Sequence, residues 1–156
     1  WADDWKPENA KRIINAAITA KGSDFDGVLA SNDGTAGGVV QALSEEGLAG
    51  KKLVTGQDAE LVACQRIVNG TQSMTIYKPL KSLATSAAEL AVKVAKKQVV
   101  AVNNSVDNGK IKVPALLNEV IAVNKDNMVQ TVIKDGFHPF DEVYRGVPDA
   151  QRPPKP

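Results

Sequence analysis

The sequence predicts an α/β fold, in which a parallel sheet is flanked by helices. The main observation is a pattern that occurs three times: a short apolar run ends in a polar turn, and a helix-like segment follows. The three run-and-turn segments are Val28 to Asp33, Leu53 to Asp58 and Met74 to Pro79. Strands that alternate with helices of this length imply right-handed crossovers and a parallel sheet. A chain of 156 residues is long enough for one lobe with its own core.

Helical periodicity is clear near the start of the chain. Pro7 suits the first turn of a helix and Gly22 suits its end, and apolar side chains recur between them every three or four positions. We therefore expect a helix from Pro7 to Gly22. The pattern continues as an alternation of strands and helices, with strands at 26–30, 52–55 and 73–76 and helices at 34–46, 59–69 and 80–97.

The pattern changes after Gln98. Residues 103–109 are rich in turn formers and predict an exposed loop. Short extended segments are expected at 111–113 and 120–122, and Asn124 is suited to cap a short helix over 125–134. The tail from His138 onward contains five prolines, so we expect it to lack regular structure and to be either flexible or laid on another surface.

Composition excludes several classes of partner. Lys and Arg number 19 against 18 Asp and Glu, which leaves a formal charge of +1 and indicates no nucleic-acid-binding surface. Charged residues interrupt each apolar stretch well before the roughly 18 residues of a membrane span. Cys64 is the only cysteine, so no internal disulfide is predicted, and no Cys/His cluster has metal-ligand spacing. The chain begins with Trp1 rather than Met, so we expect a processed product.

No residue pattern indicates catalysis. His138, the only histidine, lies in the predicted tail, where we expect a solvated side chain rather than a catalytic one. The segment Gly34 to Gly38 lacks the Gly-Lys-Ser/Thr ending of a phosphate loop and the spacing of a dinucleotide site. We expect these glycines to allow close packing of a helix start against the sheet. The sequence thus predicts a protein that is not an enzyme and that needs no cofactor and no metal.

Three polar side chains stand in the turns that follow the predicted strands. Such turns lie at the carboxyl ends of parallel strands, where these folds bind ligands, so Asn32, Asp58 and Lys78 would share one rim. Taken singly, Asn32 and Asp58 could each be only a helix N-cap, and Lys78 only a surface charge. Taken together, an amide, a carboxylate and an ammonium group suit a polyhydroxylated ligand, since a sugar hydroxyl both donates and accepts hydrogen bonds.

The apolar face of a sugar ring needs a flat hydrophobic partner. Trp1 and Trp5 both precede the first predicted helix, and Trp5 is the better candidate because it lies nearer to that helix. The alternative is that this tryptophan anchors packing. A binding site made of Trp5 and the three turn residues is therefore our expectation for this chain.

A resemblance to a known family rests on four segments: Trp5 to Ala10, Ala30 to Gly38, Gly56 to Glu60 and Gly70 to Pro79. They resemble the C-terminal lobe of bacterial periplasmic D-xylose-binding proteins, which belong to the type I sugar-binding group that feeds ABC transporters. The resemblance runs from Trp1 to about Phe137. Asn32 and the Gly-Gln-Asp turn are shared across the group and indicate only a sugar. Lys78 is more selective, because ribose and galactose binders more often have glutamine in the matching turn.

The resemblance implies a role for each candidate residue. Trp5 would stack on the pyranose, and Asn32, Asp58 and Lys78 would hydrogen-bond its hydroxyls. It also implies one lobe of a type I periplasmic binding protein fold, divided into a C-terminal sugar-binding lobe over 1–100, a hinge return and terminal helix over 101–137, and a proline-rich tail over 138–156. The N-terminal lobe is absent from this chain, so we expect the isolated chain to bind D-xylose weakly or not at all.

The expected function is therefore non-catalytic binding of a monosaccharide, D-xylose or a related pentose. The expected partners are the N-terminal lobe of the same protein and an ABC permease or a membrane sensor. A separate chain is one option for the N-terminal lobe. The expected location is periplasmic or extracytoplasmic, with a lipid anchor on the absent N-terminal part as one option. The alternative is the effector-binding half of a LacI-type transcription regulator, which shares this fold but adds a DNA-reading module. An unrecognised α/β enzyme ranks third.

Overall fold

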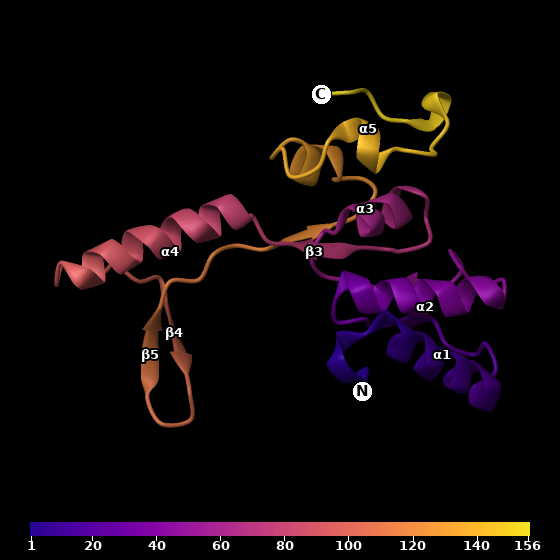
Figure 1. Cartoon of the computed structure of the whole chain (residues 1–156), viewed down its shortest axis with the longest axis horizontal. Helices are drawn as coiled ribbons and strands as arrows, with labels where there is room; N and C mark the ends of the chain where they lie inside the picture. The colour runs from indigo at the N-terminus through magenta and orange to yellow at the C-terminus, as the bar shows by residue number, and fades with distance from the viewer. The chain divides into compact units, whose positions relative to one another are not determined.

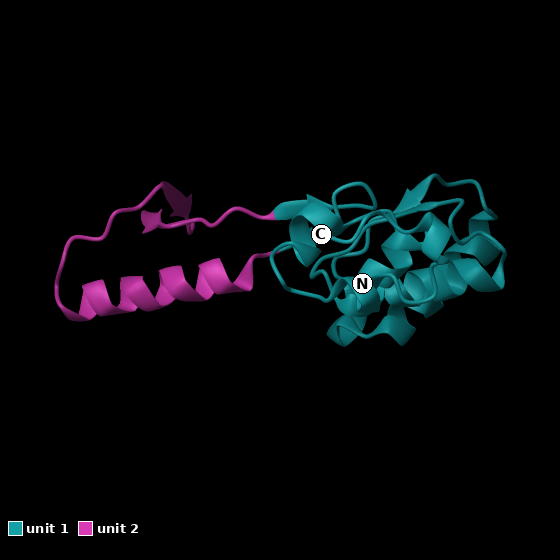
Figure 2. Cartoon of the chain, turned by 90° about the horizontal axis from the view of Figure 1, so that it is seen from above, with its two compact units in different colours: residues 1–77, 121–156 teal, residues 78–120 magenta.

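The computed structural model describes residues 1–156 and divides them into two compact units (Figure 2). Unit 1 comprises residues 1–77 and 121–156, and unit 2 comprises residues 78–120. These boundaries differ from the predicted division, which placed its boundaries after residues 100 and 137. The helix predicted over 80–97 therefore belongs to a different unit from the first two turns, and the boundary between the units divides the third turn after Tyr77.

Unit 1 contains four strands: β1 (Gly27–Val28), β2 (Leu53–Val54), β3 (Thr75–Tyr77) and β6 (Ile121–Val123) (Figure 1). β1 and β2 pair in parallel, and β3 and β6 pair antiparallel. A parallel bridge between Gln57 and Ile76 links the two ladders. The three predicted strands are confirmed in shorter form, and so is the parallel pairing of β1 with β2. The strand that returns to unit 1, β6, runs against the others.

The helices of unit 1 are η1 (Asp3–Trp5), α1 (Pro7–Lys21), α2 (Asp33–Glu45), α3 (Leu61–Val68), η2 (Val129–Ile133), α5 (Phe140–Val143) and η3 (Asp149–Gln151). η1 and η3 are 3₁₀ helices and η2 is a π-helix. One apolar core, which includes Leu43 and Val54, lies among α1, α2 and the first two strands. A second core joins α3, β3 and β6 to the C-terminal segment. None of the helices is long and apolar enough to cross a membrane.

The C-terminal segment packs against the second core, which agrees with the alternative of a tail laid on another surface; the expected lack of regular structure is wrong for α5 and η3. Phe140, Val143, Tyr144 and Val147 are buried there. His138 is half-buried, and its Nε2 lies 2.7 Å from the carbonyl oxygen of Ala59, so it is not the solvated histidine that we expected. Pro139 and Pro148 are the N-cap residues of α5 and η3, where a fixed φ and a missing N–H do no harm.

The segment before this tail also differs from its prediction. The helix expected over 125–134 is a turn followed by the π-helix η2. Asn124 does not cap a helix, since the N-cap of η2 is Met128; its Oδ1 instead accepts hydrogen bonds from the backbone N–H groups of Asp126 and Asn127 at 2.9 and 3.2 Å and stabilises the turn.

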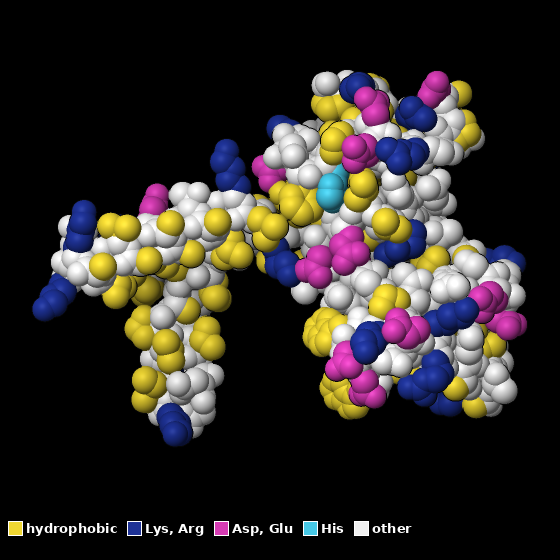
Figure 3. Space-filling view, viewed as in Figure 1, with side chains coloured by type: hydrophobic (Ala, Val, Ile, Leu, Met, Phe, Trp, Pro, Cys, Tyr) yellow, Lys and Arg dark blue, Asp and Glu magenta, His cyan; other side chains and the backbone are white.

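Unit 2 consists of the helix α4 (Leu80–Ala95) and a hairpin of β4 (Asn104–Asp107) and β5 (Lys112–Ala115). The loop predicted over 103–109 is therefore wrong for the four residues of β4. No residue of unit 2 is buried. Apolar side chains lie exposed along α4 and along the hairpin (Figure 3), among them Leu80, Val94, Val106 and Ile111. Unit 2 thus has apolar faces but no core of its own.

The glycine-rich start of α2 packs against another helix rather than against the sheet. A Cβ atom on Gly38 would lie 2.0 Å from the carbonyl oxygen of Pro7 and 3.1 Å from the backbone nitrogen of Lys11. Only glycine allows this approach between α2 and the start of α1. A Cβ atom on Gly34 in the same helix would meet no atom closer than 3.5 Å.

We predict that Gly38→Ala lowers the free energy of unfolding by about 2–3 kcal/mol, because one backbone must move away from the other. Gly34→Ala is the matched control and should be neutral or stabilising by about 0.5 kcal/mol, since alanine is the better helix former. Urea unfolding followed by circular dichroism measures both. Equal effects of the two substitutions would contradict the close approach.

Candidate functional site

Asn32 ends the turn after β1 and caps α2. Its Oδ1 accepts hydrogen bonds from the backbone N–H of Thr35 at 2.9 Å and from the Thr35 hydroxyl at 2.7 Å. In return, Thr35 Oγ1 accepts the backbone N–H of Asn32 at 3.3 Å, which completes a capping box. The cap uses the oxygen of the amide, and no hydrogen bond within the chain uses its Nδ2 group. Asn32 is therefore the N-cap of α2, and the cap uses only the oxygen of its amide.

Asp58 lies in the turn between β2 and α3. The backbone N–H groups of Asp58 and Ala59 both donate hydrogen bonds to Thr75 Oγ1 at 3.0 Å. The backbone N–H of Asp33 donates to the carbonyl oxygen of Gln57 at 2.8 Å. Because this bond lies one residue from Asn32 and one residue from Asp58, it holds the two turns side by side.

Beneath these turns lies Asp33, a carboxylate that is fully buried. Its Oδ2 accepts hydrogen bonds from the backbone N–H of Glu60 at 3.0 Å and from the Thr75 hydroxyl at 2.9 Å. Its Oδ1 accepts one from Gln72 Nε2 at 2.9 Å. Burial raises the pKa of this carboxyl group, while the hydrogen bonds and the nearby Arg66 act in the lowering direction. The group is thus a buried acceptor with its partners in place.

Arg66 closes the same network from α3. Its Nε donates to Gln72 Oε1 at 2.8 Å, and its Nη2 donates to the backbone carbonyl of Asp33 at 2.8 Å. Burial lowers the pKa of this guanidinium, and the Asp33 carboxylate acts in the raising direction. The sequence analysis missed Asp33, Gln72, Thr75 and Arg66. The one available signal was an acidic residue next to the Asn32 cap, which also suits an ordinary helix start.

The turn that carries Asp58 contains a strained residue. Ala59 has φ +54°, in the left-handed region that a residue with a Cβ atom adopts at a cost of roughly 1–2 kcal/mol. Its N–H is held by Thr75, and its carbonyl oxygen faces His138 Nε2 at 2.7 Å and Cys64 Sγ at 3.6 Å. The surrounding bonds thus hold a backbone conformation that the chain would not adopt by itself.

Trp5 lies in η1, and its side chain is 58% exposed, so it does not anchor packing. Asp4 and Trp5 have φ values of +56° and +57°, which places two successive non-glycine residues in the left-handed region. No hydrogen bond joins Trp5 to the turns of Asn32 and Asp58. Lys78 directly follows β3 and is the first residue of unit 2. The structure thus places Asn32 and Asp58 in neighbouring turns of unit 1, Trp5 in η1 of the same unit, and Lys78 in unit 2.

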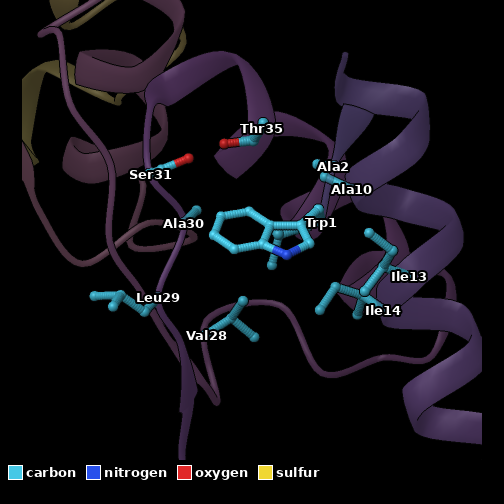
Figure 4. A pocket seen from close by; sticks show the side chains of 11 residues that line it. Trp1, Ala2, Ala10, Ile13, Ile14, Val28, Leu29, Ala30, Ser31 and Thr35 are labelled. Carbon is cyan, nitrogen blue, oxygen red and sulfur yellow. The ribbon is translucent and has the colours of Figure 1, made fainter. Parts of the chain in front are cut away.

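An apolar hollow lies beside β1, between that strand and the helices α1 and α2 (Figure 4). Its lining is mostly aliphatic and includes Ile13, Ile14 and Leu29, with Trp1 beside them and Ser31 and Thr35 as its polar members. A sugar needs several polar partners at once, so this hollow does not suit one. Nor do three or more His, Cys, Asp or Glu side chains gather where they could hold a metal ion.

The chemistry of the two turns suits a small polar ligand. An amide, from Asn32, and a carboxylate, from Asp58, lie in turns at the carboxyl ends of parallel strands, and a buried network fixes the backbone of these turns. Fold and site together define the class: an α/β ligand-binding lobe.

Comparison with known proteins identifies the family. The family model described as "Periplasmic binding protein domain" matches residues 2–98. The D-xylose-binding periplasmic protein of Haemophilus influenzae is 51% identical over 144 residues, and that of Escherichia coli is 50% identical over 143 residues. Each alignment covers 92% of this chain and 43% of the relative. The chain belongs to the periplasmic binding protein family and spans less than half the length of these relatives.

A solved structure agrees with this assignment. The carbohydrate transporter solute-binding protein of Chloroflexus aurantiacus, crystallised with D-glucose, superposes with a TM-score of 0.79 at 33% sequence identity. The match covers 89% of this chain and 42% of that protein. The predicted fold class, one lobe of a type I periplasmic binding protein, is thus confirmed.

The buried thiol of Cys64 should make the stability of the protein depend on pH in the alkaline range. Burial, and then the Asp33 carboxylate, raise the pKa of Cys64 from 9.0 to about 12. A raised pKa means that the stability contributed by the neutral thiol is complete below pH 9 and is lost as the pH rises toward about 12. We therefore expect the native thiol not to react with a disulfide reagent at mildly alkaline pH, and to react fully once the protein is unfolded.

The control for this prediction is Cys64→Ala, which cannot ionise. Its free energy of unfolding should fall less steeply than that of the parent over the same alkaline range, as measured by denaturant unfolding at a series of pH values. Rapid labelling of the native protein, or identical pH profiles for the two proteins, would show that the thiol is not buried as described.

Proposed function

We propose that this chain is the C-terminal lobe of a protein that binds a monosaccharide, D-xylose, without chemical change. The observation that carries the proposal is the hydrogen bond from Asp33 N–H to the Gln57 carbonyl oxygen, which holds the turn of Asn32 next to the turn of Asp58. The identity of about 50% to proteins named as D-xylose-binding supports xylose as the sugar.

In this proposal each of the four candidate residues has one role. The Nδ2 group of Asn32 donates to a sugar hydroxyl, the carboxylate of Asp58 accepts from others, and Lys78 adds a charged donor. Trp5 stacks on the apolar face of the ring. Its exposure and its strained backbone support this role, since strain of this kind concentrates at ligand sites.

We propose further that a second, N-terminal lobe completes the site. Three facts support it: the chain spans 43% of its relatives, unit 2 has no buried residue, and an apolar hollow lies beside β1. Burial of such apolar surface is favourable by about 25 cal/mol per Å². In our proposal, unit 2 is covered by the N-terminal lobe, and the two lobes close on the sugar as a hinged pair.

The proposed setting follows from the same relatives. The closed protein delivers its sugar to an ABC permease or presents it to a membrane sensor, in the periplasm or another extracytoplasmic space. In one form of this proposal, a lipid anchor on the N-terminal part holds the protein at the membrane surface. The relatives reported above are sugar-binding and transport proteins, so we do not carry the LacI-type regulator further.

The test of the proposed function is calorimetric titration with D-xylose of the complete two-lobed protein and of this chain alone. We expect one sugar per complete protein, and at least about 100-fold weaker binding to the chain alone, which corresponds to about 2.7 kcal/mol of lost contacts. D-ribose is the control sugar and should bind the complete protein more weakly. No binding of D-xylose to the complete protein would overturn the function, and tight binding to the chain alone would overturn the need for a second lobe.

A second prediction separates the capping role of Asn32 from its ligand role. Asn32→Asp keeps an oxygen that can cap α2 but replaces the amide donors with an acceptor, so affinity for D-xylose should fall by about 1.5–3 kcal/mol, while stability stays within about 0.5 kcal/mol. Asn32→Ala should lose both the oxygen that caps α2 and the amide donors, so its affinity should fall as well and its free energy of unfolding should be about 1 kcal/mol lower. Titration and denaturant unfolding measure the two quantities. Unchanged affinity in Asn32→Asp would leave Asn32 as a cap only.

A further inference from the structure

The hydroxyl of Thr75 uses its full hydrogen-bonding capacity between Asp33 and the turn of Asp58. Its hydroxyl donates to Asp33 Oδ2 at 2.9 Å and accepts the N–H groups of Asp58 and Ala59 at 3.0 Å each. A threonine hydroxyl has one donor and two acceptor lone pairs, so no capacity remains. Thr75 is also fully buried, which means that it cannot itself touch a ligand.

The orientation of this hydroxyl is set by Asp33. A carboxylate can only accept, so the Thr75 proton must point toward it, and both lone pairs are then directed at the two N–H groups of the turn. Gln72 and Glu60 N–H hold the same carboxylate in place at 2.9 and 3.0 Å. Asp33 therefore fixes the direction in which the Thr75 hydroxyl donates and the direction in which it accepts.

The turn needs such support because Ala59 is strained. Its left-handed backbone, with φ +54°, directly follows Asp58 and determines where the Asp58 side chain begins. Thr75 holds the N–H side of Ala59, and His138 Nε2 lies 2.7 Å from its carbonyl oxygen. Without the hydroxyl, two N–H groups lose their acceptor and the relaxed conformations of Ala59 become accessible.

We propose that Thr75, oriented by Asp33, is a positioning residue of the sugar site: it never contacts the sugar, and it fixes the backbone of Asp58 and Ala59 so that the Asp58 carboxylate is aimed before the sugar arrives. This rests on the proposed function for the identity of the ligand. The physical basis is preorganisation, since a turn that is already fixed loses less conformational freedom on binding.

A matched pair of variants tests the proposal in the complete two-lobed protein. Thr75→Val keeps the shape of the side chain and removes the hydroxyl, whereas Thr75→Ser keeps the hydroxyl and removes the methyl group. We expect Thr75→Val to bind D-xylose at least about 10-fold more weakly than the parent, and Thr75→Ser to stay within about 3-fold. Ile67→Val, in the neighbouring buried core, controls for lost stability alone and should leave the affinity unchanged.

Amide hydrogen exchange supplies a readout that needs no ligand. In the parent protein the N–H groups of Asp58, Ala59 and Glu60 should exchange slowly although they lie in a turn, and in Thr75→Val the first two should exchange at least about 10-fold faster than in Thr75→Ser. A merely structural role would lower the stability of both variants without this local difference.

The outcomes separate this proposal from the proposed function. Equal affinities for the parent and Thr75→Val, or an equal loss in Thr75→Ser, would overturn the positioning role. If the complete parent protein bound no D-xylose, the proposed function would fail, and the exchange rates would still decide whether Thr75 fixes the turn. If Thr75→Val did not fold, unprotected Asp58 and Ala59 amides in the parent would overturn the proposal, and protected ones would support it.

Discussion

The buried carboxylate of Asp33 accepts three hydrogen bonds from two segments that lie far from it in the sequence. They come from Gln72 before β3, from Thr75 within β3, and from the N–H of Glu60 before α3. A buried charge without partners would be strongly destabilising, so folding must deliver these three donors together. The same residue donates its own N–H to Gln57. Asp33 therefore couples the start of α2 to the two following strand and turn units.

This coupling also explains the glycine in the Gly-Gln-Asp turn. A Cβ atom on Gly56 would lie 2.1 Å from Asp33 Oδ1 and 2.5 Å from Gln72 Nε2. Any other residue would displace the carboxylate from its partner. The same short motif thus places Gly56 against the buried network and ends at Asp58, the residue proposed to bind the ligand.

The sequence predicts well what depends on local periodicity and poorly what depends on distant partners. The three strand, turn and helix repeats, and the Asn32 cap, follow from patterns within about 15 residues. The hairpin of unit 2 had a local signal too, because Asn108-Gly109 is a favoured hairpin turn, but the polar composition of 103–109 led to the prediction of a loop. The C-terminal prolines were misinterpreted as breakers, although proline is well tolerated where a helix begins.

The site shows the same division. Asn32 and Asp58 could be found from their place after apolar runs, because the ends of parallel strands meet at one edge. Asp33 and Thr75 could not, since nothing in a single sequence distinguishes a buried acidic residue from an exposed one. Their role depends on the Glu60 amide and on Gln72, whose approach is a tertiary event. The division of the chain into two units likewise depends on which surfaces pack, and not on local propensity.

The exposed apolar side chains of unit 2 support the proposed second lobe independently of sugar chemistry. Isolated helices of about this length are marginal in water and depend on packing of an apolar face. α4, of 16 residues, has no buried residue, and Leu80, Leu83 and Val92 are each exposed by more than 40%. The hairpin of β4 and β5 also depends on packing, since a two-stranded hairpin alone is barely stable. Both elements expose apolar side chains that a further apolar surface would cover, and this cover would stabilise them by removing those side chains from water.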